Sequence, residues 1–404
     1  MSIQVSETST QASERVEREK RGKPSHWVHS KPTEFENPWP SFRKHTAGDF
    51  LELLPNAFST LGSPSKDSIA QIPIQKPTWG WGADAKLIAE NAHKIKATWL
   101  GHACFLVELP SSTTGVRGAR ILFDPVFSDR CSPSQWVGPK RFTLDEAAPC
   151  RLEDVPEVDA VVISHNHYDH MDTTSLKHLL ARTPAPHVFA PLGNAPYFRS
   201  LGVPASRTHC LDWWDARRVT TAVSESHSVA FDITFTPGQH FTGRGIRDRF
   251  KTLWGGWVVE AVPTDSSDAT VPARVYFGGD TGYRAVTSLA DEDAELPVCP
   301  AFAEIGKRWG GFDFAMIPIG AYAPRKFMSP IHCAPRDSVA IFQDIRARRA
   351  LGMHWGAWIL TTEDILEPPK LLATECAKAG VKEGAFGVCA IGETVCFDVG
   401  RDEA

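Results

Sequence analysis

The chain has 404 residues, of which 42% are hydrophobic, and a formal net charge of −5. This composition supplies a large apolar core, and it excludes a general nucleic-acid binder, which would carry a clustered basic excess. No run of about 18 apolar residues occurs, so we expect no helix that spans a membrane. The nine cysteines include no C-x-x-C pair, which predicts reduced, mostly buried thiols.

Residues 1–35 are rich in Ser, Thr, Glu, Lys and Arg, a composition that predicts a disordered tail. They contain no apolar stretch typical of a secretory signal, and their acidic residues do not fit a transit peptide, so we expect a cytoplasmic protein. Residues 36–404 are expected to form one domain that begins with an N-terminal arm over residues 36–95. The tryptophans of this part either pack onto the main body or form a surface that contacts lipid.

From residue 95 onward, apolar runs alternate regularly with polar segments. The predicted strands lie, in chain order, within residues 95–109 (two strands separated at Gly101), 119–127, 158–165, 186–192, 228–237, 253–262, 273–280, 312–320, 349–355 and 394–399. Apolar residues at helical spacing predict helices over 173–182 and 336–350. Strands come in a block, then alternate with helices, and then repeat, which favours a layered α/β fold with large sheets. The acidic segment 284–298 predicts an insertion in a surface loop.

One segment, VDAVVISHNHYDHMD over residues 158–172, places four metal-competent side chains directly after a buried strand. These are His165, His167, Asp169 and His170. A loop that follows a strand is free to aim several side chains at one point while the sheet holds its start. Neutral imidazole and carboxylate are the ligands that zinc prefers, so this segment predicts a metal site.

Further ligands are expected at other strand ends, because one short segment cannot complete two coordination spheres. FTPGQH ends a predicted strand at His240, VYFGGDTG ends one at Asp280, and RALGMHW ends one at His354. The glycines around Asp280 would let another backbone approach closely. Each of these residues alone would be explained as a hydrogen-bonded buried side chain. The presence of the H-x-H-x-D-H segment in the same chain favours their interpretation as metal ligands.

The full set of motifs resembles a known family. HNHYDH, a later lone histidine, a GDTG aspartate and a late histidine are similar to the metallo-β-lactamase superfamily. SPSQWVGPKRF, LDWWD, LWGGWVVE, PAFAEIGKRWG and IPIGAYAPRKFM resemble the N-acylphosphatidylethanolamine-hydrolysing phospholipase D family in particular. The similarity runs from about residue 37 to 369.

The resemblance implies an αββα sandwich, with two packed mixed sheets flanked by helices and the site at one edge. It also implies two zinc ions, although the sequence leaves another metal such as iron open. The implied ligands are His165, His167 and His240 for the first ion, Asp169, His170 and His354 for the second, and Asp280 as the bridge. Asp124, in LFDPVF, would support a ligand histidine.

The activity implied by the resemblance is hydrolysis of N-acylphosphatidylethanolamine to N-acylethanolamine and phosphatidate. A hydroxide between the metals would attack phosphorus, and Asp169, Asp280 and His332 are the implied catalytic residues. The implied partners are a phospholipid substrate, a membrane surface bound peripherally, and a second copy of the chain in a homodimer. No nucleic acid is expected, since the charge does not support it.

The implied substrate contacts depart from the family in places. Gln135 and Trp136 occupy positions that contact the lipid amide, and Trp136 stands where a tyrosine is usual. His332 matches a histidine near the substrate phosphate, with a structural loop histidine as the alternative. Arg244 matches a basic position, but Gly243 replaces a second basic residue, which leaves dependence on bile acids open.

Two other classes of function are compatible with the sequence. A lactonase, a thioester hydrolase or a tRNA-processing nuclease would share the same metal motif, but the many Trp and Phe residues fit a lipid better. A non-catalytic binding scaffold would usually have lost ligands, and here all seven positions are intact. For the lipid substrate we expect the arm to contribute to membrane docking through Trp39, Phe42, Phe50 and Leu51.

Overall fold

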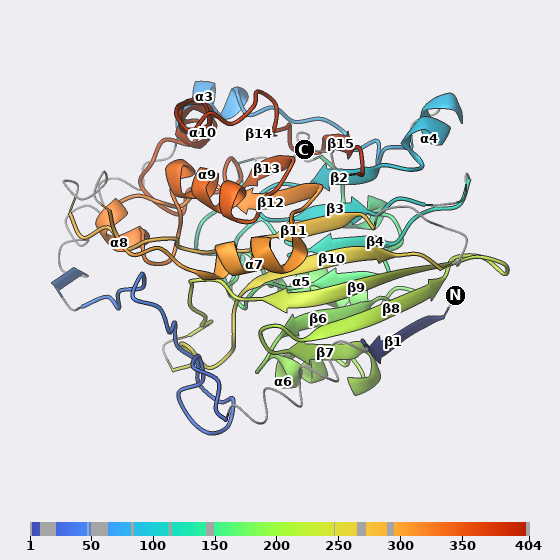
Figure 1. Ribbon diagram of the computed structural model, residues 1–404, viewed down its shortest axis with the longest axis horizontal. Helices are drawn as coiled ribbons and strands as arrows, with labels where there is room; N and C mark the ends of the chain where they lie inside the picture. Colours follow the sequence, from blue (N-terminus) through green and yellow to red (C-terminus); the bar gives the residue numbers. More distant parts are fainter. Residues whose placement is uncertain are drawn as a thin grey trace.

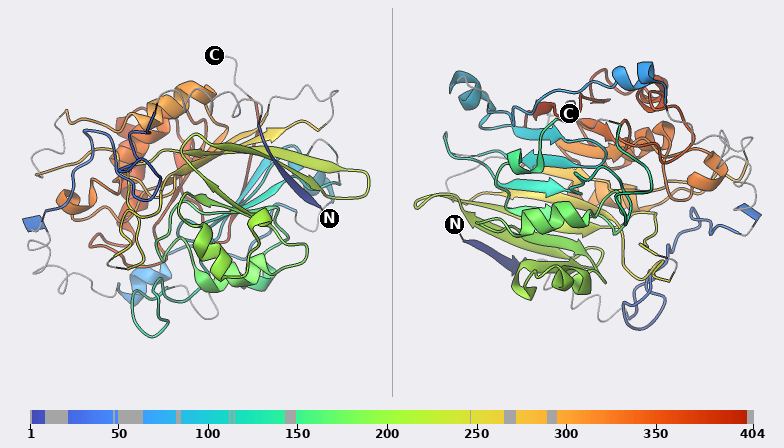
Figure 2. Two further views of the ribbon diagram at one scale, coloured as in Figure 1. Left: turned by 90° about the horizontal axis from the view of Figure 1, so that it is seen from below. Right: turned by 180° about the vertical axis from the view of Figure 1, so that it is seen from behind.

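The computed structural model describes residues 2–8, 22–46, 48–49, 64–81, 85–111, 113, 115–142, 149–245, 247–264, 272–288 and 295–400. Two mixed β-sheets pack face to face, and helices cover their outer faces (Figures 1 and 2). The predicted αββα sandwich is therefore confirmed. Residues 289–294, the middle of the expected acidic insertion over 284–298, lie outside the described residues.

The first sheet contains eight strands, which pair in the following order across the sheet. They are β1 (Ile3–Glu7), β8 (Ala216–Ala222), β9 (Ser228–Thr236), β10 (Gly256–Val262), β11 (Arg274–Phe277), β12 (Phe314–Pro318), β13 (Ala350–Met353) and β14 (Phe386–Gly387). The strands from β1 to β11 pair antiparallel, whereas those from β11 to β14 pair parallel.

The second sheet contains seven strands. Their order is β15 (Thr394–Phe397), β2 (Ile95–Trp99), β3 (Phe105–Glu108), β4 (Arg120–Phe123), β5 (Ala160–Val162), β6 (His187–Pro191) and β7 (Thr208–Leu211). The pairing is antiparallel from β15 to β4 and parallel from β4 to β7. Both sheets thus combine an antiparallel half with a parallel half, and the parallel strands are joined by crossover connections.

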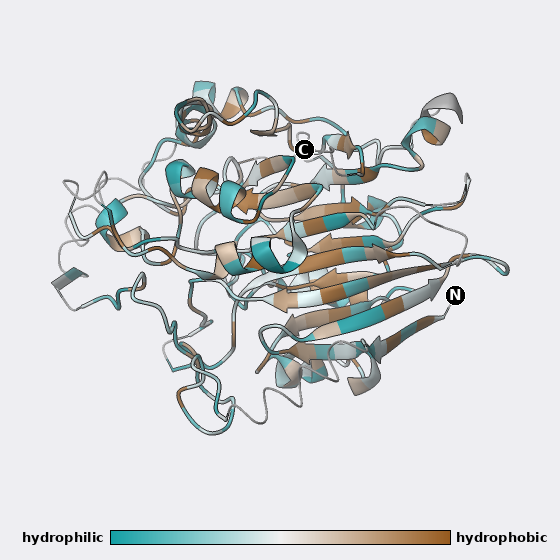
Figure 3. Cartoon of the chain, viewed as in Figure 1, coloured by the Kyte–Doolittle hydropathy of each residue, from teal (hydrophilic) through white to brown (hydrophobic). Residues whose placement is uncertain are grey.

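Helices on the two outer faces follow from their apolar spacing. On α7 (Ala301–Trp309), Phe302, Ile305 and Trp309 are buried and share one side, so that helix packs against the eight-stranded sheet beside α9 (Pro335–Asp344). On the opposite face, α5 (Thr173–Leu180) and α6 (Ala195–Ser200) form a core with the seven-stranded sheet. Figure 3 shows mainly hydrophobic residues along the central strands and a mixture of hydrophobic and hydrophilic residues on α7 and α9.

The remaining helices are short or lie at the periphery. They are α3 (Lys66–Ala70), α4 (Ala85–Asn91), α8 (Arg325–Met328), α10 (Glu367–Lys378) and the 3₁₀ turns η1 (Leu152–Asp154) and η2 (Ala205–Arg207). The strands expected between residues 95 and 399 are present, and those that the sequence did not predict are β1, β7, β8 and the short β14. The nine cysteines are free thiols, as expected.

The prediction of a disordered tail over residues 1–35 is wrong for the part that the structure describes. Strand β1 pairs with β8 at the edge of the sheet, and Ile3 and Val5 pack against the core. Phe35 is buried in the same core, and its backbone N–H donates to the carbonyl of Phe250 at 2.9 Å. A few apolar residues at strand spacing therefore anchor a segment whose average composition is polar.

Several strands end at the same edge of the sandwich, where the candidate site lies. The carboxyl ends of β2, β4, β5, β9, β11 and β13 are followed by His102, Asp124, His165, His240, Asp280 and His354, respectively. Loops after strand ends are the usual place for ligands in layered α/β folds, because the sheet fixes where each loop begins.

Candidate metal centre

The loop 163–172 is fixed at both ends. It starts from the buried strand β5 and ends at Asp172, whose carboxylate caps α5 by accepting from the backbone N–H groups of Thr174 and Ser175 at 3.3 and 3.1 Å. The four polar side chains between these ends therefore cannot move freely away from the sheet edge.

Three histidines converge at one side of this loop. The Nε2 atom of His165 lies 2.9 Å from Nδ1 of His167, and Nε2 of His240 lies 3.3 Å from the same atom. His240 comes from the loop after β9, which is bridged to the loop after β11 between Gln239 and Gly282. The structure thus brings together the three residues expected at the first metal, and their ligand atoms are close enough to hold one ion.

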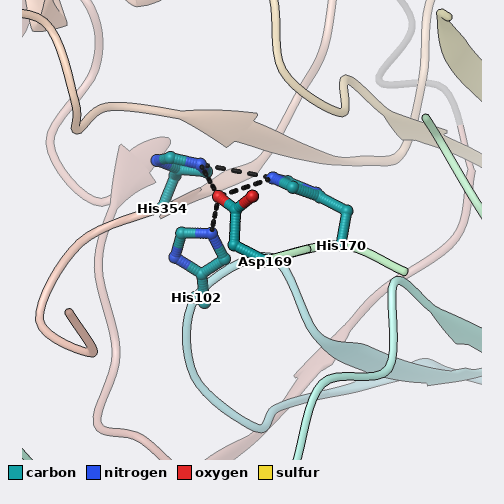
Figure 4. A group of neighbouring side chains, drawn as sticks. All are labelled: His102, Asp169, His170 and His354. Atoms are coloured by element: carbon teal, nitrogen blue, oxygen red, sulfur yellow. Dashed lines mark hydrogen bonds and ion pairs between the residues drawn. The ribbon is translucent and has the colours of Figure 1, made fainter. Parts of the chain in front are cut away.

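A second group of side chains, which includes Asp169, His170 and His354, is drawn in Figure 4. The Oδ2 atom of Asp169 lies 3.4 Å from Nε2 of His170 and 3.5 Å from Nε2 of His354. The two histidine Nε2 atoms are 3.3 Å apart. These three residues are the ones expected at the second metal, and together with His102 they form a group that can hold an ion.

Asp280 lies between the two groups. Its Oδ1 atom is 3.1 Å from Nε2 of His354, and its Oδ2 atom is 3.1 Å from Nε2 of His170. The same Oδ2 atom lies 3.8 Å from Nε2 of both His165 and His240. A carboxylate in this position faces histidines of both groups, which is the geometry that a bridging ligand requires.

The loop that carries Asp280 approaches the β5 loop closely, and glycine makes this possible. Gly279 has a φ of +57°, and a Cβ built there would lie 2.7 Å from Cβ of Ser164. Any larger residue would push Asp280 away from His165, so the GGD sequence is required by the approach of the two backbones.

Hydrogen bonds on the outer ring nitrogens fix the histidine tautomers. His240 donates its Nδ1–H to the carbonyl of Ile331 at 2.7 Å, and His170 donates its Nδ1–H to Asp124 at 2.7 Å. Ser164 donates its hydroxyl to Asp124 at 2.5 Å, so its oxygen accepts Nδ1–H of His165 at 2.9 Å. All three rings therefore present an unprotonated Nε2 to the centre when neutral.

Asp124 contacts His170, a histidine of the second group, which is compatible with the supporting role that the resemblance implies. Its side chain is buried, and besides His170 and the Ser164 hydroxyl it accepts the backbone N–H of Ser164 at 2.7 Å. Its φ of +37° is unusual for a residue other than glycine. Such a conformation persists only where the surroundings enforce it, here to aim one carboxylate at a histidine and at the start of its loop.

The charges in the cluster require a cation. Burial lowers the pKa of His165 and His240 well below the usual histidine range, so these rings are neutral donors of lone pairs. Burial also lowers the pKa of His354, but the charge of Asp280 outweighs it and raises that pKa to about 9. Among the described residues, no Lys or Arg forms an ion pair with Asp280 or Asp169, and Oδ1 of Asp280 accepts no hydrogen bond. The residues therefore fit bound metal ions.

His332 also faces the centre. It is buried, and its Nε2 atom lies 3.6 Å from Oδ2 of Asp280, while its Nδ1 atom has no hydrogen-bond partner among the described residues. Burial lowers its pKa to about 4. Its position at the rim of the cluster is compatible with a contact to a bound substrate.

Gln135 and Trp136 lie on a loop whose base is the bridge between Arg130 and Lys140. The amide of Gln135 is used within this loop, where it exchanges two hydrogen bonds of 3.0 Å with the backbone of Arg130. Trp136 is 90% exposed and Val137 is 65% exposed. The loop thus presents an apolar tip to the solvent.

Arg244 is placed differently from a free substrate-binding cation. Its guanidinium donates to the carbonyls of Asn166 and Met171 at 3.1 and 2.8 Å, and it stacks on the ring of Tyr168 at 3.9 Å. Arg244 therefore clamps the loop that carries the four clustered metal-competent residues.

His102 is the residue of the cluster that sequence reasoning missed. It follows β2, and its Nε2 atom lies 3.0 Å from Oδ2 of Asp169 (Figure 4). The signal in the sequence is weak, since a lone histidine in GHAC is common in a core. Only its place after a predicted strand, in the manner of His240 and His354, could have drawn attention to it.

Comparisons with known proteins agree with this geometry. A family model described as a beta-lactamase superfamily domain matches residues 119–355. A Caenorhabditis elegans protein named N-acyl-phosphatidylethanolamine-hydrolyzing phospholipase D 1 is 35% identical over 76% of this chain and 78% of its own length. A Saccharomyces cerevisiae protein named N-acyl-phosphatidylethanolamine-hydrolyzing phospholipase D, mitochondrial, is 29% identical over 90% of this chain and 75% of its own length.

Among solved structures, the isothiocyanate hydrolase from Delia radicum gut bacteria aligns with a TM-score of 0.49 at 17% identity. That alignment covers 75% of this chain and all of the other. In the part of the chain that the structure describes, no helix has the length and apolar character needed to cross a membrane.

Proposed function

Since the chain belongs to the N-acylphosphatidylethanolamine-hydrolysing phospholipase D family of the metallo-β-lactamase superfamily, we propose that it hydrolyses N-acylphosphatidylethanolamine with two bound zinc ions. Its coarser description, a hydrolase of the metallo-β-lactamase fold, follows directly from that membership. The observation that carries the proposal is the position of Asp280 between two groups of histidines that can bind metal.

The metal ions, when bound, would make water nucleophilic at neutral pH and neutralise charge on the phosphoryl oxygens. His165, His167 and His240 would hold one ion, Asp169, His170 and His354 the other, and Asp280 both. In the reaction, the oxygen of water forms a bond to phosphorus, and the bond from phosphorus to the ethanolamide oxygen breaks. A proton passes to that leaving oxygen, which gives N-acylethanolamine and phosphatidate.

His332 is the proposed contact to the phosphoryl group. It faces Asp280 from the rim, and its Nδ1 atom has no partner among the described residues, so one ring nitrogen is available to a ligand. The two carboxylates at the centre, Asp169 and Asp280, act by holding metal rather than by attacking substrate, because both lie against histidine nitrogens.

A phospholipid substrate requires that the centre reach a bilayer, since exposing its chains to water costs about 0.8 kcal/mol per CH₂ group. Of the arm residues expected to dock, Trp39 contacts the body of the protein instead. Trp39 stacks on Trp213 at 5.3 Å, and the side chain of Asn37 donates to the carbonyl of His240 at 2.8 Å. The arm thus packs beside the metal centre. Phe50 and Leu51 lie outside the described residues.

We therefore assign bilayer contact to the loop 131–140. Its tip carries Trp136 and Val137, its base carries the half-buried Arg130 and the exposed Lys140, and residues 130–142 contain no acid. Trp suits the boundary between water and lipid, and basic residues are attracted to anionic head groups. At the base of the loop, Cys131 packs with Trp358, whose ring meets the ring of His102 edge-on at 4.9 Å. The loop therefore projects from the rim of the centre.

Replacing both Trp136 and Val137 by Ser is expected to weaken binding to vesicles of N-acylphosphatidylethanolamine and anionic phospholipid about tenfold or more, because each buried apolar side chain contributes about 1.5–3 kcal/mol. The comparison variant is Trp39→Ser, which should lower the melting temperature but leave vesicle binding of the folded protein unchanged. Sedimentation with vesicles measures both. Normal binding by the double variant, together with loss of binding in Trp39→Ser, would show that the arm and not the loop 131–140 binds the membrane.

The proposed activity is tested by incubating the purified protein with a panel of substrates and identifying products by mass spectrometry. The panel contains N-acylated and plain phosphatidylethanolamine, a lactone and a thioester. We expect N-acylethanolamine and phosphatidate from the N-acylated lipid. Hydrolysis of the lactone or thioester without action on the lipid would instead identify another hydrolase of the same superfamily.

A further inference from the structure

The turn between β2 and β3 holds His102 in a conformation that most residues avoid. Gly101 has a φ of +96° and His102 a φ of +53°, in the left-handed region. His102 is 2% exposed. Left-handed backbone at a non-glycine residue is costly and tends to occur where a functional arrangement requires it. The question is what this placement of the imidazole achieves.

The backbone of His102 is tied to the metal centre. Its carbonyl accepts the backbone N–H of His354 at 3.0 Å and the indole N–H of Trp99 at 2.8 Å. His354 itself has a φ of +68°. The two turns therefore brace one another across the gap between the sheets, since β2 belongs to the seven-stranded sheet and β13 to the eight-stranded one.

The imidazole of His102 is confined from two sides. One face lies against the ring of His354, with 3.9 Å between ring centroids, and the edge of the Trp358 ring packs at 4.9 Å. In this position the Nε2 atom meets Oδ2 of Asp169 at 3.0 Å (Figure 4). An ionised carboxylate can only accept a hydrogen bond, so Nε2 of His102 carries the proton.

We propose that His102 is a positioning residue that orients the carboxylate of Asp169 toward the second metal. Its Nε2–H occupies one lone pair of Oδ2 and leaves the other directed at His170 and His354, whose Nε2 atoms lie 3.4 and 3.5 Å away. In the described part of the chain, the other nitrogens near Oδ2 belong to those two expected ligands, which would be bound to metal. Without His102, the Asp169 side chain, which is 16% exposed, is free to rotate out of the site.

This role of His102 rests on one part of the proposed function, namely that the centre binds metal. It does not depend on which substrate the centre hydrolyses. It also excludes His102 as a direct ligand through Nε2, because that nitrogen cannot donate to Asp169 and coordinate a metal at once.

The test compares His102→Gln with His102→Met. The two side chains are unbranched and similar in size, and both must adopt the same left-handed backbone, but only Gln can donate to Asp169. The readout is the affinity for each metal equivalent, measured by competition with a chromophoric chelator. We expect Met to weaken binding of the second equivalent by about 10–100-fold, the usual effect of removing a supporting group, and Gln to restore most of that loss.

His209→Met is the control for loss of a partly buried histidine elsewhere. His209 lies on β7 and forms a hydrogen bond with His187 at 2.9 Å, away from the metal cluster. The His209→Met variant should therefore bind metal as tightly as the unmodified protein. Unchanged affinity in His102→Met, or equal losses in the Gln and Met variants, would overturn the proposal. If neither variant folds, the tautomer of His102 in selectively ¹⁵N-labelled protein decides: Nε2–H supports the assignment, and a bare or metal-bound Nε2 overturns it.

Discussion

Changing Asp280 to Asn is expected to lower turnover at least ~100-fold, because it removes the charge that faces both groups of histidines. The carboxylate lies 3.1 Å from Nε2 of His170 and 3.1 Å from Nε2 of His354, and it is buried. The amide keeps the shape but offers one oxygen instead of two, and its NH₂ group would face nitrogens that need a cation. Steady-state kinetics on N-acylphosphatidylethanolamine, with metal content determined on the same sample, measures the effect.

Asp159→Asn is a matched control, because Asp159 is also a buried aspartate but pairs with Arg117 at 2.7 Å. Breaking that pair should lower the free energy of unfolding and leave turnover of the folded protein nearly unchanged. If Asp280→Asn retains metal and turns over at nearly the normal rate, Asp280 does not bridge the metals.

Removing metal is the second change with a large expected effect. Protein purified without chelator should contain close to two equivalents of transition metal, mainly zinc, since seven side chains converge in two groups that share Asp280. Dialysis against a chelator should reduce activity to the background rate, and returning zinc should restore it. Elemental analysis combined with the activity assay measures both. Protein that lacks metal from the start, or stays active after complete removal, would contradict the dinuclear centre.

Most residues of the metal cluster were predictable from the sequence, because each of them lies in a loop directly after a predicted strand. H-x-H-x-D-H is local, so it needs no knowledge of the fold. His240, Asp280 and His354 could be added because each follows a predicted strand, and strand ends of both sheets meet at one edge. That meeting is a property of the layered architecture, which the alternation of strands and helices already favours.

The parts that sequence reasoning missed depend on contacts between distant residues. Trp39 and Trp136 are alike as amino acids, but Trp39 is held by Trp213 and Trp136 has no such neighbour among the described residues. Arg244 matched a substrate position, whereas its guanidinium is engaged by the backbone of residues 166 and 171. Strand β1 exists because β8 offers an open edge, and nothing in the first eight residues alone reveals that partner.

The most direct test of the proposed phosphodiesterase is hydrolysis of N-acylphosphatidylethanolamine in H₂¹⁸O, followed by mass spectrometry of both products. Attack of water on phosphorus predicts one ¹⁸O atom in phosphatidate and none in N-acylethanolamine. Label in N-acylethanolamine would mean that a carbon–oxygen bond breaks instead. Label only in released fatty acid would identify a carboxylic ester hydrolase, and either result would contradict the assignment of a phospholipase D reaction to this centre.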